Sequence, residues 1–149
     1  MKKLLIVAAL GTAGLVSTGV QAQGSTNGNF NVVINLTPAC SISAIPDMTF
    51  SYTSFQAGPA TGSPSNYTVT CTDGLPYTMA LDALTTTDDA VNLQSTLALS
   101  AAGGTGNGAA QGFQVTGSMP AGQGGTCANP AGCTNAAATN RQRTLTVSW

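Results

Sequence analysis

The feature that most constrains this chain is a two-residue alternation of apolar and polar side chains, which recurs along the sequence without helical periodicity. Successive side chains of a strand point to opposite faces, so this alternation predicts half-buried β-strands. The clearest case is "NFNVVINLT", residues 29–37. Further runs, each bounded by Gly, Pro, Asn or Asp, cover residues 40–45, 48–55, 66–72, 77–84, 91–99, 112–117 and 143–149.

About eight short strands at this spacing predict an all-β fold, an antiparallel sandwich of one domain. Asp73 to Pro76, "DGLP", has the composition of a turn. Residues 101–111 and 121–140 are rich in Gly, Ala and Asn, and we expect them to be loops.

The amino-terminal 22 residues have the composition of a signal peptide. A basic Met-Lys-Lys head precedes thirteen apolar residues, Leu4 to Val16, and "VQA" (Val20 to Ala22) supplies a cleavage site. A bilayer-spanning helix needs roughly 20 apolar residues, so the run is too short for an anchor. We therefore predict export, with residues 1–22 removed.

The predicted mature chain carries two arginines against five aspartates, a net charge of −3, and has no Lys, Glu or His. Such a surface provides no long-range electrostatic attraction between the protein and nucleic acid. Without His or Lys, the usual general bases for nucleophilic catalysis are missing, so we expect no enzyme, no catalytic residue and no cofactor. Asp88-Asp89 is the one carboxylate pair; a turn or strand end is the favoured role, with calcium binding as a minor alternative.

Four cysteines in an exported chain predict two disulfides, for which three pairings exist. Cys127 and Cys133 bracket "ANPAG", a turn-rich loop that a local bridge closes easily, and this leaves Cys40 with Cys71. A metal site is disfavoured because the chain has neither His nor a CxxC pair.

The amphipathic strand near the start of the mature chain raises the question of what it packs against. Two arrangements are possible. Both terminal strands could pair within one closed sandwich, or the leading strand could complete the sheet of a neighbouring molecule. Burial of its apolar face contributes roughly 6–12 kcal/mol, at about 1.5–3 kcal/mol per side chain and as an upper estimate. That face consists of Phe30, Val32, Ile34 and Leu36.

Several segments, in the same order, resemble the spore coat protein U domain family, which supplies the pilins of archaic chaperone–usher fimbriae. The most specific is "VTCTDGLPY", residues 69–77, with a cysteine before it. The others are the amphipathic strand ending in "PACSIS", then "MTFSY", "GSMPAGQ" and the closing "RTLTVSW". Residues 101–111, mostly small side chains, and the Cys127–Cys133 loop depart from the family pattern.

The resemblance implies an incomplete immunoglobulin-like antiparallel β-sandwich, residues 38–149, preceded by a donor-strand extension, residues 23–37, which we call the arm. A periplasmic chaperone first fills the gap, and at an outer-membrane usher the arm of the next copy replaces it. Phe30, Val32, Ile34 and Leu36 then are the donor residues. The carboxy-terminal edge strand that the chaperone contacts presents Leu145, Val147 and Trp149, and Cys40–Cys71 is the family's structural bridge.

We therefore expect a structural protein at the cell surface, a fimbrial subunit joined to copies of itself by strand donation and serving adhesion and biofilm growth. A single domain with its own arm favours a shaft subunit over a two-domain tip adhesin. The alternatives are a non-polymeric spore-coat or extracellular matrix protein and a secreted carbohydrate-binding module. A hydrolase is the weakest alternative. No small-molecule substrate and no nucleic-acid partner is expected.

Overall fold

The computed structural model describes residues 24–149, so the predicted signal peptide lies outside the described range. The chain divides into a segment that ends at Asn35 and a compact unit from Leu36 to Trp149. Residues 24–149 contain no helix and therefore none with the length and hydropathy to cross a bilayer. Nine strands are assigned in this range, and all pair antiparallel, which confirms the predicted all-β class.

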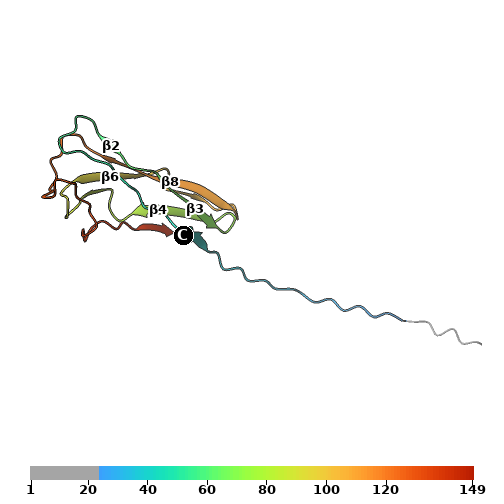
Figure 1. Cartoon of the computed structure of the whole chain (residues 1–149). Helices are drawn as coiled ribbons and strands as arrows, with labels where there is room; N and C mark the ends of the chain where they lie inside the picture. Colours follow the sequence, from blue (N-terminus) through green and yellow to red (C-terminus); the bar gives the residue numbers. More distant parts are fainter. Residues whose placement is uncertain (1–23) are drawn as a thin grey trace, which may run out of the picture. The chain divides into compact units, whose positions relative to one another are not determined.

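The larger of two sheets has six strands. Their bounds are β1 (Cys40–Ile42), β2 (Ala60–Thr61), β3 (Ser65–Cys71), β5 (Thr85–Thr87), β6 (Gln94–Leu99) and β8 (Ala110–Met119). The order is β1-β3-β8-β6-β5, and β2 also pairs with β8. Figure 1 shows the long β8 beside β6 and β3 in this sheet.

The smaller sheet has three strands in the order β7-β4-β9. Their bounds are β7 (Gly103–Thr105), β4 (Pro76–Leu81) and β9 (Leu145–Ser148). The last strand, red in Figure 1, pairs with β4 in a register that sets Leu145 opposite Leu81 and Ser148 opposite Thr78. β9 pairs on this side alone, so it is an edge strand of the smaller sheet.

The core lies between the two sheets and is small. Tyr67, Val69 and Cys71 from β3 meet Tyr77 and Met79 from β4, and Val69 is 0% exposed. Many inward-facing side chains around this centre are only half-buried. They are Met48, Leu81, Leu97, Leu99, Phe113, Leu145 and Val147. A sandwich of this size therefore leaves part of its apolar interior in contact with solvent.

The predicted strands over residues 66–72, 77–84, 91–99 and 112–117 correspond to β3, β4, β6 and β8. The strand predicted over residues 48–55 is not assigned as one, although Met48, Phe50 and Tyr52 alternate as half-buried residues between exposed ones. Its polar contacts are separate bonds, such as Ser63 N–H to Thr49 O at 2.9 Å, rather than a continuous ladder.

The predicted loop over residues 101–111 was wrong in part, because β7 and the beginning of β8 lie within it. Sheet pairing uses backbone groups, so β7 needs no alternation of side chains. Its glycines allow a close approach: a Cβ on Gly103 would lie 2.3 Å from Tyr77 O, and one on Gly104 would lie 2.9 Å from the Tyr77 hydroxyl.

Both expected disulfides form, Cys40–Cys71 between β1 and β3 and Cys127–Cys133 within the loop before β9. Next to the first, Ala39 N–H donates to Thr72 Oγ1, and Thr72 N–H donates to Ala39 O, both at 3.0 Å. The turns at residues 72–75 and 105–109 join the same region, since Gly74 N–H donates to Gly106 O at 2.9 Å.

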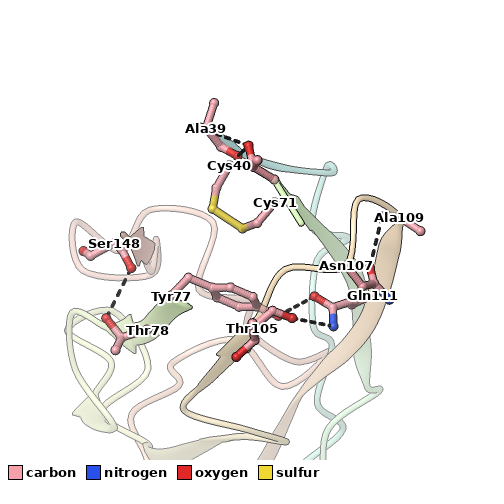
Figure 2. Close-up of a disulfide and its surroundings, with 11 residues drawn as sticks. Ala39, Cys40, Cys71, Tyr77, Thr78, Thr105, Asn107, Ala109, Gln111 and Ser148 are labelled. Carbon is pink, nitrogen blue, oxygen red and sulfur yellow. Dashed lines mark hydrogen bonds between the residues drawn. A yellow bond between two sulfur atoms is a disulfide. The ribbon is translucent and has the colours of Figure 1, made fainter. Parts of the chain in front are cut away.

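We call this region the disulfide end; it comprises residues 39–40, 71–75 and 105–109. Figure 2 shows the bridge together with the Asn107–Ala109 turn and the Tyr77–Gln111–Thr105 hydrogen bonds. Ser148 O accepts a bond from the Thr78 hydroxyl at 3.5 Å, so the carboxyl end of β9 lies at this end of the smaller sheet (Figure 2).

Candidate functional site

The apolar face of the arm is exposed. Phe30, Val32, Ile34 and Leu36 are between 72% and 85% exposed, and no strand is assigned in residues 24–39. The predicted strand over residues 29–37 is therefore not formed in the isolated chain. Alternation makes a segment suitable for a sheet, but the strand itself requires an edge that accepts its backbone groups. The role of these four residues as donors stays a prediction.

The compact unit contains a cleft of about 760 Å³ between its two sheets. One side is the segment from Ile45 to Phe50, and the other is formed by Leu81 and Leu145 of the smaller sheet. Its apolar floor comes from the larger sheet and the turn that precedes β6. The floor residues are Val91, Leu93, Leu97, Val115 and Met119. The half-buried side chains of the core thus include those that line this cleft.

β9 borders the cleft at its first residue, Leu145. Leu145 and Val147 pack against the core, whereas Thr146 and Ser148 are exposed, as the alternation predicted. Trp149 shares their parity in the sequence but is 59% exposed. The edge position of β9 is a fact of the topology, while contact with a chaperone stays a prediction.

A polar segment, Asn135 to Arg143, forms the wall of the cleft next to the beginning of β9, and we call it the strap. The Asp88-Asp89 pair holds it. Asp88 Oδ2 accepts a hydrogen bond from Asn135 Nδ2 at 2.9 Å. Asp89 Oδ1 accepts from Thr139 N–H at 3.0 Å, and Asp89 N–H donates to Asn140 Oδ1 at 3.2 Å.

The same carboxylate of Asp88 closes its own turn. Its Oδ1 accepts from the N–H groups of Ala90 at 2.9 Å and Val91 at 3.0 Å, so the predicted turn role of the pair is confirmed. Among residues 24–149, no cluster of three or more His, Cys, Asp or Glu side chains is arranged to hold a metal ion.

These contacts set the ionisation of Asp88. Partial desolvation raises its pKa, but hydrogen bonds from Val91 N–H, Asn135 and Ala90 N–H outweigh that effect and hold the pKa below its ordinary value. Because the folded pKa is lowered, the stabilisation is present above the unfolded value of about 3.9 and is lost as the pH falls through the folded pKa. The contribution of Asp88 to holding the strap is therefore present at neutral pH and is lost in acid.

Asp88→Ala is expected to expose the strap to trypsin. After Lys3 the only Lys or Arg residues are Arg141 and Arg143, so cleavage there reports strap opening directly. We expect cleavage roughly tenfold faster, because the three hydrogen bonds that Asp88 accepts are lost, at about 0.5 kcal/mol each. Both variants are compared as unassembled subunits, and Asp73→Ala, at an exposed turn on the disulfide end, is the matched control that should leave the rate unchanged. Equal rates in both variants would refute the role assigned to Asp88.

Sequence reasoning identified the arm, β9, the four cysteines and the Asp88-Asp89 turn, but it missed the cleft and the strap. The strap lies in a loop without periodicity, and its partner carboxylates are about 50 residues earlier in the chain, at separations of 47 for Asn135 and 50 for Thr139. The one available signal was the occurrence of Asn and Thr after Cys133.

The profile of the Spore Coat Protein U domain matches residues 26–133, more than two thirds of the chain. The match begins within the arm and includes both cysteine pairs, while β9 falls beyond it. No curated protein and no solved structure gives a significant match. The chain belongs to the Spore Coat Protein U domain family, a non-catalytic structural family associated with secreted surface and pilus-like subunits.

Proposed function

We propose that the protein is a structural subunit of a secreted surface fimbria, which polymerises when the arm of one copy enters the cleft of another. The observation that carries the proposal is the pairing of two incomplete features in one chain. The arm presents four exposed apolar side chains on one face, and the compact unit has a cleft with an apolar floor next to the beginning of β9, an edge strand.

The arm is long enough to pair along the whole of β9, which has four residues. Seven residues from Phe30 to Leu36 span roughly 23 Å as a strand, at about 3.3 Å per residue. The backbone of β9 offers hydrogen bonds along its open side, and alternate arm side chains enter the cleft, as in other cases of strand addition. The other face of the arm carries Asn29, Asn31, Val33, Asn35 and Thr37, and its four polar residues suit the solvent side of an added strand.

The small core also favours this function. Leu81, Leu97 and Leu145 are half-buried and line the cleft, so an inserted strand removes further apolar surface from water on both partners. In this proposal, the sandwich is an immunoglobulin-like fold that lacks one strand. A copy of the same chain supplies the missing piece.

An exported subunit with an open cleft needs a temporary partner before assembly. We assign that role to a periplasmic chaperone that pairs with the β9 edge near Leu145, Val147 and Trp149, followed by transfer at an outer-membrane usher. The two disulfides support export, because such bridges persist in oxidising compartments. Adhesion and biofilm growth are the expected uses of the resulting fibre.

The test is the behaviour of surface material sheared from cells that express the protein. Copies joined by strand insertion should run as a ladder on denaturing gels without heating and collapse to one band after boiling. Electron microscopy of the same material should show thin threads. A single monomer band before heating, without threads, would favour a closed coat or matrix protein and would refute the proposal.

A further inference from the structure

The compact unit has two chemically distinct ends. β4 begins beside the disulfide end at Pro76 and runs to Leu81, where the next residue, Asp82, donates its N–H to Thr144 O. β9 runs back from Leu145, directly after the strap, to Ser148 at the disulfide end. The strap and the disulfide end therefore lie at opposite ends of the smaller sheet (Figure 1).

The direction of an inserted arm decides which end faces the donating copy. All seven strand pairings in the two sheets are antiparallel. Antiparallel pairing is also slightly more stable per residue than parallel pairing. An arm antiparallel to β9 has its carboxyl end, at Leu36, beside Leu145 and the strap of the accepting copy.

The connection between arm and body is short. Only Thr37 and Pro38 separate Leu36 from Ala39, which is fixed to Thr72 by two backbone-anchored hydrogen bonds. Three Cα–Cα steps of 3.80 Å cover at most about 11 Å. The disulfide end of the donating copy must then lie against the strap of the accepting copy.

We infer that the strap of one copy and the disulfide end of the next form a second, body-to-body contact that sets the angle between consecutive subunits. This inference rests on the proposed strand insertion. The contact is heterologous, head to tail, and such contacts generate filaments when the rotation does not close a ring.

The charges at the two ends are complementary. Arg141 is exposed at the strap and Asp73 is exposed at the disulfide end, and neither is in an ion pair within residues 24–149, where Arg143–Asp82 is the one salt bridge. Opposite charges at the rim of an interface favour the correct orientation of the partners. The remaining exposed residues of the strap are mainly Asn, Ala and Thr, so the partner it fits is a polar surface of a second copy.

The test uses the fact that the sequence contains no lysine after Lys3. Ala136→Lys places an amine on the strap, and Ala109→Lys places one on the disulfide end; both alanines are exposed. Fibres of the double variant are treated with a short amine-reactive cross-linker, boiled and separated. The expected result is a ladder that survives boiling. Mass spectrometry of the cross-linked peptides should show residues 136 and 109 joined. The same measurement distinguishes these links from any link to the amino terminus.

The controls address direction and specificity. Each single variant should give no 136–109 link, and any boiling-resistant ladder that it forms should contain only links to the amino terminus. Ala98→Lys combined with Ala109→Lys should give no 98–109 link between copies, because Ala98 is exposed on β6 and lies outside the strap. A 109–109 link in the Ala109→Lys variant would mean that two disulfide ends meet, which overturns the inference. No 136–109 link in fibres that form a normal unheated ladder overturns it as well. If the wild-type chain forms no ladder on unheated gels, the proposed function itself is wrong.

Discussion

Substituting asparagine for Phe30, Val32, Ile34 and Leu36 is expected to abolish fibre assembly while the compact unit still folds. All four side chains are exposed in the isolated chain, so their loss removes nothing from its core. In the fibre, their burial contributes roughly 6–12 kcal/mol as an upper estimate. Buried amides without partners add a further cost. Even a third of the lower value is more than a tenfold loss of affinity, at 1.4 kcal/mol per factor of ten.

The measurement is the unheated gel ladder together with electron microscopy of the exported material. A matched control replaces four residues of the opposite face, Asn29, Asn31, Val33 and Asn35, with serine, and should retain both the ladder and the threads. If the asparagine variant still forms fibres, or if the two variants fail equally, the alternating face is not the polymer contact.

Removal of the Cys40–Cys71 bridge by paired serine substitution is expected to lower the melting temperature by more than about 10 °C. The bridge spans a sequence separation of 31, for which the chain-entropy treatment gives roughly 3–4 kcal/mol. For a domain of this size, 1 kcal/mol corresponds to about 3–5 °C. Cys71 is also 1% exposed within the core, so a serine hydroxyl there is desolvated.

The Cys127–Cys133 bridge provides the internal comparison. It closes a sequence separation of only 6 in an exposed loop, and the same treatment gives roughly 2.4 kcal/mol. Its removal should therefore cost less, with a smaller fall in melting temperature measured by circular dichroism. If both double variants melt at the same temperature, the larger role of Cys40–Cys71 in stability is wrong.

The strands that were predicted best from the sequence are those in which every second side chain is buried in the core. Tyr67, Val69 and Cys71 alternate in sequence and are all nearly inaccessible in β3. β7 was missed because Gly103 and Gly104 pair through backbone groups and carry no pattern. The segment at residues 48–55 has the opposite property, since it alternates but has no continuous ladder.

The site was only partly predictable for a similar reason. The arm could be recognised from the sequence because its apolar residues occupy every second position of one short segment. The strap depends on which distant loops the sheets bring together, such as Asp89 with Thr139 across a separation of 50 residues. No local rule of periodicity or turn composition carries that information, and only the assembled topology supplies it.

The solvent-exposed indole at the end of β9 gives the molecule a built-in optical reporter. Trp149 is the only tryptophan in the chain and is 59% exposed beside the unpaired edge. A strand that pairs with that edge excludes water from the indole, so the emission maximum of the intrinsic fluorescence should shift as a subunit joins a fibre. The kinetics of fibre growth can then be followed without an attached dye.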